Sequence, residues 1–154
     1  MNLRTFRTFV NLFAGEVEIF LGGYILIIFL TIISMSFSMN QFFGMNLYLS
    51  RFFVAIFISM IVGGIAIQIS TVKRLSDGYG GYLYSSIAAI SNSVAVFFET
   101  IEMIMYGTNW FEFEFLRVQS ENPLMYFIGF MVFLYSGLMA ILSILDLIFI
   151  VNKS

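Results

Sequence analysis

The sequence contains no cysteine and no histidine. A chain without cysteine forms no disulfide, holds no iron–sulfur cluster and has no thiol nucleophile. A chain without histidine lacks the usual axial ligand of a membrane haem and the commonest general base. Because methionine alone is not expected to hold a haem, these absences predict a chain with no cofactor and no metal of its own.

Charge is also scarce. Only 10% of the 154 residues are charged, 60% are apolar, and the mean hydropathy is +0.98. Soluble domains are about one-quarter charged, so the composition excludes a water-soluble fold. We therefore expect the lipid bilayer as the surroundings of this chain, with no nucleic-acid partner and no soluble small molecule bound by this chain alone.

The apolar residues are gathered in long runs without charge. Four such runs span residues 19–50, 52–72, 78–98 and 122–145. Each reaches the roughly 20 residues that a helix needs to cross the hydrocarbon core, and stretches such as YILIIFLTII lack the alternation of a membrane barrel. The runs predict an all-α integral membrane protein with four transmembrane helices.

We expect these helices to form a single membrane domain, part of a multi-subunit bundle. The predicted helices cover about 12–37, 46–72, 82–106 and 123–151, the third having an alternative end near Phe111. Residues 1–11 are interpreted as an amphipathic lead-in, and the first helix as retained rather than cleaved, since its apolar stretch is too long for a signal peptide. Small residues four apart, Ser59 with Gly63 and Ser136 with Ala140, are typical of close helix contacts.

Lysine and arginine are distributed unequally between the two sides of this topology. The side with both termini carries Arg4, Arg7, Lys73, Arg74 and Lys153, and the opposite side carries Arg51 and Arg117. Because inner loops are enriched in these cations, both termini are expected in the cytoplasm or the mitochondrial matrix. The 20 phenylalanines fit an AT-rich organellar gene, which favours the mitochondrial inner membrane, with a bacterial inner membrane as the alternative.

Two carboxylates, Glu99 and Glu102, lie near the end of the hydrophobic stretch SVAVFFETIEMIMYG. Seven-residue steps place polar residues on nearly one helical face, with Glu102 beside them: Ser85, Asn92, Glu99 and Tyr106. An ionised acid in hydrocarbon costs at least a few kcal/mol, and two acids so close disfavour joint ionisation. One of the pair is therefore expected to hold or release a proton, as a proton relay requires.

The sequence allows three environments for Glu99 and Glu102. The acids are buried and relay protons, or they lie in the last turns of the helix at the interface, where solvation is cheap, or they form ion pairs with a partner chain. Asp146 is expected at the inner headgroup level, with a weaker claim to the relay. Glu16 and Glu18 are expected to be solvated or paired with Arg4 or Arg7.

No motif indicates an autonomous enzyme. The stretch DGYGG is typical of a turn, since no phosphate-binding glycine pattern accompanies it. Three other short motifs follow one another in the C-terminal part of the chain. They are the basic pair in VKR (Lys73 and Arg74), the glutamate Glu102 in TIEMIMYGTN, and the pair Met125 and Tyr126 that opens the last helix.

With these motifs, residues 60–154 resemble the small subunit 4L of the proton-pumping NADH:quinone oxidoreductase, respiratory complex I. The resemblance implies a subunit without chemistry of its own, part of the hydrophilic axis of the membrane arm, in which Glu102 or Glu99 exchanges protons. The last helix of that family carries a second glutamate, where this sequence has Tyr135 and Ser136. These two side chains are expected to line a water path, and the second acid is lost or supplied by a partner.

Two other functions compete with this reading. One is a lineage-specific structural subunit of an ATP synthase or an oxidase, with no titrating role. The other is a small four-helix transporter or channel, against which the lack of a visible inverted repeat weighs. Burial of Glu99 and Glu102 favours the relay, whereas acids at the headgroup level favour the structural subunit.

Overall fold

The computed structural model describes residues 2–36, 47–76, 81–111 and 122–152. Nearly all of them lie in four long helices and one short 3-10 turn: α1 (Leu3–Ser36), α3 (Leu47–Ser76), α4 (Gly81–Tyr106), η1 (Gly107–Asn109) and α6 (Pro123–Val151). Each long helix contains a stretch long and apolar enough to cross a membrane. The chain is an all-α, multi-pass membrane protein, as the uncharged runs predict.

The predicted helix boundaries agree best for the third and fourth spans. α4 begins one residue before the predicted start, and α6 has the predicted bounds. α3 continues to Ser76 instead of ending near residue 72. The prediction for residues 1–11 is wrong, because α1 already begins at Leu3. Arg7 and Asn11 from this segment bind Asp146 of α6, and these contacts hold the first turns against the bundle.

Local sequence explains where α4 ends and α6 begins. Gly107 has a φ of +71°, the left-handed conformation that commonly terminates a helix and that glycine adopts without strain. Before α6, the side chain of Asn122 accepts a hydrogen bond of 3.1 Å from the backbone N–H of Leu124. Pro123 then occupies the first helical position, where its missing N–H removes no helical hydrogen bond.

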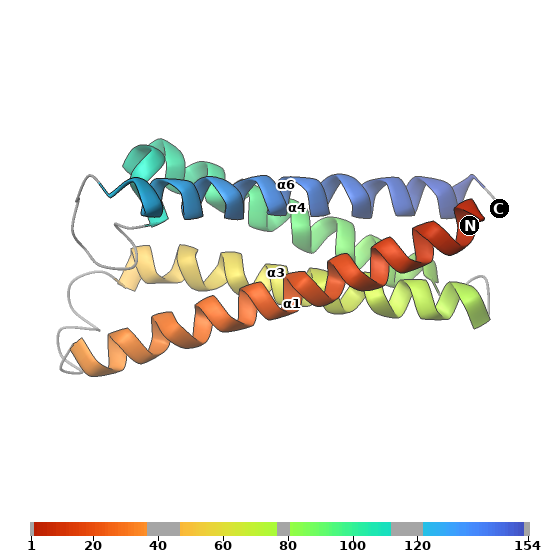
Figure 1. The fold of residues 1–154 in the computed structure, drawn as a ribbon, viewed down its shortest axis with the longest axis horizontal. Coiled ribbons are helices and arrows are strands. Elements are labelled where there is room, and N and C mark those ends of the chain that lie inside the picture. The colour runs from red at the N-terminus through yellow and green to blue at the C-terminus, as the bar shows by residue number, and fades with distance from the viewer. Residues whose placement is uncertain (1, 37–46, 77–80, 112–121, 153–154) are drawn as a thin grey trace.

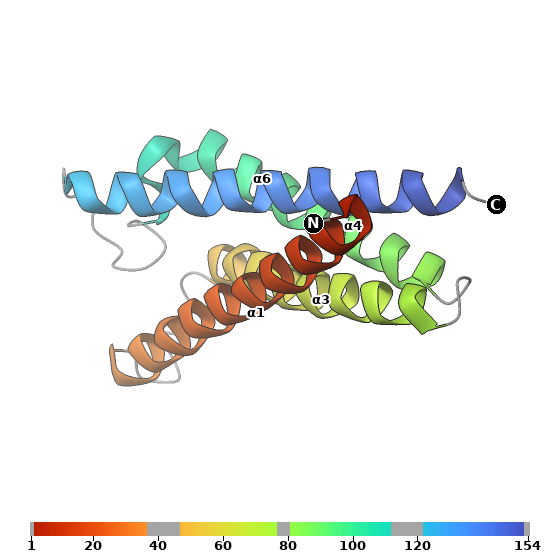
Figure 2. The ribbon, with the colours of Figure 1, turned by 45° about the vertical axis from the view of Figure 1, so that its right-hand side comes forward.

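The four helices alternate in direction, so that both chain termini lie at one end of the bundle (Figure 1). We call this end the terminal end; α3 also ends there and α4 begins there. α1 packs along α3, α3 along α4, and α4 along α6. Figure 2 shows α1 crossing obliquely in front of α3 rather than lying parallel to α6.

Glycines bring α1 and α3 into close contact. A Cβ added to Gly15 would lie 2.8 Å from the carbonyl oxygen of Gly64, and one added to Gly64 would lie 2.7 Å from that of Gly15. Two turns further along α1, a Cβ on Gly22 would lie 3.1 Å from the carbonyl oxygen of Phe57. The two backbones therefore approach too closely for any larger residue, as in other membrane helix pairs with small residues at the interface.

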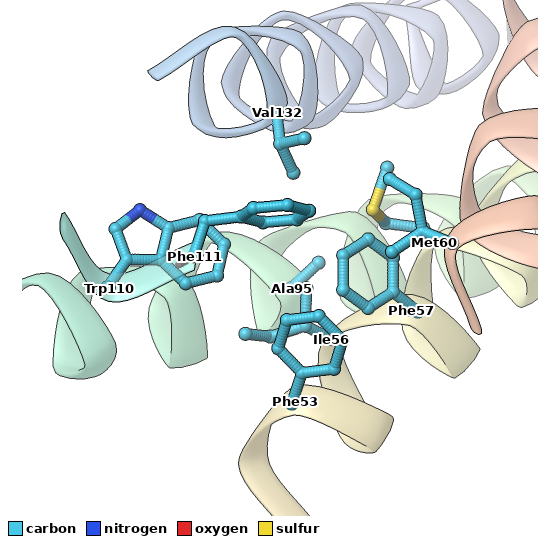
Figure 3. Packing of buried hydrophobic residues seen from close by; sticks show 9 residues of the cluster. Phe53, Ile56, Phe57, Met60, Ala95, Trp110, Phe111 and Val132 are labelled. Atoms are coloured by element: carbon cyan, nitrogen blue, oxygen red, sulfur yellow. The ribbon is translucent and has the colours of Figure 1, made fainter. Parts of the chain in front are cut away.

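An aromatic cluster fills the bundle toward the end opposite the termini (Figure 3). We call it the aromatic plug; its buried members are Ile25, Phe53, Ile56, Phe57, Met60, Ala95, Trp110, Phe111 and Val132. The ring centroids of Phe53 and Phe57 lie 4.7 Å apart. Those of Trp110 and Phe111 lie 5.7 Å apart, and these two rings pack edge to face. Residues from α1, α3, α4 and α6 meet in this plug, so it joins all four long helices through apolar contacts.

The outer surface is also apolar. All four helices expose large hydrophobic side chains, among them Phe20, Ile65, Leu83, Ile104, Phe127 and Ile141. In water such a surface would drive association, whereas lipid tails match it. The polar and charged groups inside the bundle are therefore the unusual feature of this protein.

Candidate functional site

The polar face expected on the third span lies inside the bundle. Ser85, Asn92 and Glu99 are fully buried, and Glu102, one turn from Glu99, is fully buried as well. Tyr106, the last member of the seven-residue row, is half-buried. The polar side chains of α4 thus gather on the face that contacts other helices, as the spacing predicts.

The acids of α4 are covered by protein rather than by solvent. The candidate span that contains them continues to Asn109, and the residues after α4 fold back onto the bundle, with Asn109 and Trp110 both buried. Neither acid is therefore solvated in this structure. A relay and an ion pair with a partner chain remain as readings of Glu99 and Glu102.

A third acid, Glu18 of α1, joins this site. Its side chain is fully buried, and it lies close enough to Glu99 and Tyr135 to interact with both electrostatically. Neither of its carboxylate oxygens forms a hydrogen bond to any described residue, and the same holds for Oε2 of Glu99. The structure thus brings a carboxyl group of α1 to one of α4 in the interior.

The expectation for Glu18 is therefore wrong: it is not solvated, and Arg7 pairs with Asp146 instead. Its neighbour Glu16 is exposed and accepts a hydrogen bond of 2.8 Å from Nε2 of Gln68 on α3. The signal that would have distinguished the two is the periodicity of α1. Its buried face repeats in steps of four and three residues, Asn11, Gly15, Glu18, Gly22 and Ile25, which is helical spacing.

Tyr135 and Ser136, the weaker candidates from α6, both contact the acidic site. The hydroxyl of Ser136 donates a hydrogen bond of 2.8 Å to Oε1 of Glu99. The hydroxyl of Tyr135 donates one of 2.5 Å to the carbonyl oxygen of Ala14, one turn before Glu18 on α1. These two hydroxyls connect α6 with both helices that supply the acids.

A row of polar contacts continues from Glu99 toward the terminal end. Nδ2 of Asn92 donates a hydrogen bond of 2.9 Å to Oγ of Ser143 on α6. Gly63 of α3 makes room for this amide, because a Cβ there would overlap the Asn92 side chain. Oδ1 of Asn92 is buried without a partner among the described residues, so the row has spare acceptor capacity.

Asp146 occupies the terminal end of the row and is bound by the other three long helices. Oδ1 accepts hydrogen bonds from Arg7, from Asn11 at 3.0 Å and from Arg74 at 2.5 Å. Oδ2 accepts from Ser85 at 3.0 Å and from Ser70 at 3.3 Å. We call this group of six residues the Asp146 cluster.

The contacts of Asp146 differ from those of Glu99 and Glu102. Two guanidinium groups hold its carboxylate in the charged form, and its side chain is only 1% exposed. Ten residues separate Asp146 from Ser136 along α6, about 15 Å at the helical rise. Asp146 lies near the terminal end of the span Pro123–Val151, and its ion pairs connect α6 with α1 and α3. Its weaker claim to the proton relay stays a prediction.

Within the described ranges, no three acidic side chains are arranged to hold a metal ion. The candidate site therefore consists of carboxyl and hydroxyl groups of this chain: Glu18, Glu99, Glu102, Tyr135 and Ser136. Such groups bind, hold and pass protons. Comparison of the chain with protein-family models, with curated proteins and with solved structures gave no match.

Proposed function

We propose that this chain is a membrane-arm subunit of a proton-pumping respiratory complex of the complex I type, and that its buried acids form part of a proton path. In this proposal the protein resides in the mitochondrial inner membrane among other membrane subunits, with both termini in the matrix. The resemblance of residues 60–154 to subunit 4L supports the complex, and the geometry of the acids supports the path.

The observation that carries the proposal is the pair formed by Glu18 and Glu99. Both are fully buried, and neither forms an ion pair with a described residue, since Arg7 and Arg74 pair with Asp146 instead. A buried carboxylate without a cation is costly, and a second one beside it more so. The pair therefore favours a state that shares a proton, in which the proton bound to one carboxyl group can pass to the other.

Hydroxyl groups extend the pair. A hydroxyl both donates and accepts hydrogen bonds, so Ser136, which contacts Glu99, can accept a proton from one side while it gives one to the other. Tyr135 lies within electrostatic reach of Glu18, while its hydroxyl donates to the carbonyl oxygen of Ala14. Glu102 lies one turn beyond Glu99 on the same helix and provides the next acid toward the aromatic plug.

The two halves of the interior differ in polarity. From Glu99 toward the terminal end the buried row contains Asn92, Ser143 and Ser85, whereas the aromatic plug lies toward the opposite end, where Glu102 and Asn109 are buried as well. A proton path in this chain therefore has a polar approach from the terminal end and needs a conformational change, or a partner subunit, to continue past the plug.

The structural subunit remains the second candidate, favoured by the Asp146 cluster. One carboxylate that joins four helices is what a scaffold requires, and the wide apolar surface suits contacts with lipid and neighbouring chains. In that case the buried acids stay protonated throughout and serve packing only.

The test uses the intact complex reconstituted in vesicles, with proton uptake and electron transfer measured together. Glu102→Gln and Glu99→Gln are expected to lower the number of protons moved per electron while assembly stays normal, because glutamine keeps the shape but holds no exchangeable charge. The matched control is Glu16→Gln, an exposed acid of α1. Unchanged pumping in both buried variants would exclude the relay.

The identity of the complex is tested separately. Mass spectrometry of the native membrane complex that contains this chain is expected to find an NADH-oxidising arm. If the chain instead copurifies with subunits of an ATP synthase or an oxidase, the structural candidate replaces the first one.

A further inference from the structure

We propose that the Asp146 cluster is also a binding site for the phosphate group of an anionic phospholipid in the leaflet at the terminal end. The inference is independent of proton transfer. It begins with the charges of the cluster, which do not balance. Arg7 and Arg74 carry two positive charges and share the single carboxylate of Asp146.

The carboxylate has no capacity left for further donors. Oδ1 accepts three hydrogen bonds and Oδ2 accepts two, and a carboxylate offers about four acceptor positions in all. Each guanidinium presents about five N–H donors in a planar fork. Arg7 uses Nη2 for both the side chain and the backbone carbonyl of Asp146, and Arg74 uses Nη1. Donors on both arginines therefore point away from Asp146.

Both arginines reach the surface while Asp146 does not. The exposed fraction is 23% for the Arg7 side chain, 16% for Arg74 and 1% for Asp146. Arg7 also lies over the ring of Phe149, with 4.9 Å between its guanidinium carbon and the ring centre. Asp146 holds the guanidinium through Nη2 and an aromatic ring covers one of its faces, so these two contacts restrain its orientation.

The position of the cluster near the ends of two membrane spans indicates the kind of ligand that it can bind. Arg7 lies near the beginning of the span Leu3–Ile28, and Arg74 lies next to the end of the span Phe52–Leu75. Arginines at such positions extend toward the headgroups, where phospholipid phosphates lie. Arg4, one turn before Arg7, is exposed as well.

Phosphate chemistry fits this arrangement. Both guanidinium groups bind Oδ1 of Asp146 and keep N–H donors that this contact does not use; such a planar fork binds phosphate with geometric as well as electrostatic selectivity. An acidic segment of a partner subunit is the competing occupant. The lipid is favoured because the excess charge lies at the ends of membrane spans, where anionic headgroups are always in contact, and because cations near an anionic leaflet each contribute a measurable attraction.

The experiment measures lipid retention by the full-length chain. The chain is purified from nanodiscs that contain phosphatidylcholine with increasing shares of phosphatidylglycerol or cardiolipin, and bound lipid is counted by native mass spectrometry. We expect selective retention of the anionic lipid and a higher unfolding temperature in its presence. Equal retention of phosphatidylcholine would overturn the proposal.

A charge-conserving variant separates a specific site from general attraction. Arg7→Gln combined with Asp146→Asn removes one charge of each sign, so the net charge of the cluster stays the same while one guanidinium is lost. The proposal expects anionic-lipid affinity to fall about ten-fold, the loss that corresponds to one hydrogen bond between charged groups. Unchanged affinity would mean diffuse electrostatics and would overturn the site.

Arg7→Lys serves as the second variant, because it keeps the ion pair with Asp146 and loses only the planar fork. Its unfolding temperature in pure phosphatidylcholine is expected to match that of the unaltered chain, with weaker retention of anionic lipid. Thr8→Val, an exposed neighbour whose hydroxyl bonds only to its own helix at Arg4, is the matched control. Inorganic phosphate that competes at equal concentration, or an acidic protein segment found in place of lipid, would contradict the lipid assignment.

Discussion

Ser136 of α6 and Glu99 of α4 are joined by a hydrogen bond of 2.8 Å in the buried interior. The bond satisfies one carboxyl oxygen of Glu99, while the other oxygen has no partner among the described residues. It also connects two helices in a region where lipid offers no alternative partner. The contact therefore affects both the stability of the bundle and the hydrogen bonding of the Glu99 carboxyl group.

Ser136→Ala is expected to destabilise the protein by about 1 kcal/mol. Buried unsatisfied groups cost about 1–3 kcal/mol, but interhelical hydrogen bonds in membranes average about 0.6 kcal/mol, so the lower end applies. Unfolding in mixed detergent micelles measures the difference. Ser86→Ala is the control, since Ser86 donates only to the backbone of Tyr82 on its own helix and its loss should have no effect.

Glu18→Gln is expected to reduce proton transfer by the intact complex, as the substitutions at Glu99 and Glu102 do. The amide has the same shape but cannot share a proton with Glu99. Proton uptake per electron in vesicles measures this effect. Glu16→Gln, two residues away but exposed, should pump normally; equal losses in the two variants would show that α1 has only been disturbed.

Gly64→Ala is expected to destabilise the contact between α1 and α3 by about 1–3 kcal/mol, the usual cost of overpacking. The added methyl group would lie 2.7 Å from the carbonyl oxygen of Gly15, and backbone atoms cannot move aside cheaply. Gly23→Ala is the matched control on α1, because a Cβ there meets no atom within 4 Å. Alanine at position 23 should be neutral or stabilise the helix, since glycine is the poorer helix former. Thermal unfolding compares the two, and equal stability of both variants would argue against close packing at Gly64.

Asp146→Asn is expected to destabilise the bundle by about 3–5 kcal/mol, the cost of leaving a partner of a buried ion pair without its counter-charge. Arg7 and Arg74 both lose their carboxylate at once. Limited proteolysis near the N-terminus, together with thermal unfolding, detects release of the first turns of α1. A variant that retains wild-type protection in residues 3–11 would show that the Asp146 cluster does not hold α1 in place.

Trp110, the only tryptophan of the chain, reports directly on the aromatic plug. Its side chain is fully buried, so its fluorescence emission is expected at short wavelength and should resist quenchers in both water and lipid. Phe53→Ala should shift the emission to longer wavelength and cost about 3–5 kcal/mol, the range for a large aromatic residue removed from a core. Strong quenching by brominated lipid in the unaltered protein would place Trp110 on the outer surface and contradict the plug.

Local pattern was enough to predict most of the fold. Uncharged runs of sufficient length identify membrane helices because lipid requires each segment to satisfy its own backbone. Pro123 and Gly107 mark helix ends because their effects are local. The seven-residue row from Ser85 to Glu99 predicts a buried polar face of α4 for the same reason.

Local sequence patterns did not predict which charged residues pair with one another. Arg7 and Asp146 are 139 residues apart, and nothing in either segment indicates the other, so residues 1–11 were expected outside the helix. Glu18, like Glu16, was expected to be solvated or paired with Arg4 or Arg7 because it lies near the start of the predicted first helix. Residues two apart on a helix point about 200° apart, and only the position of the neighbouring helices decides which of the two is buried.

The sequence by itself determined that this protein crosses a membrane with four helices and that α4 carries acids on one face, because hydrophobicity and helical periodicity are properties of single segments. Tertiary structure alone decided that Glu18 is buried within electrostatic reach of Glu99, that Asp146 pairs with arginines of two other helices, and that an aromatic plug joins all four long helices. The physical reason is that a charge in an apolar medium is stabilised by whichever group lies within a few ångströms in space, regardless of its distance along the chain.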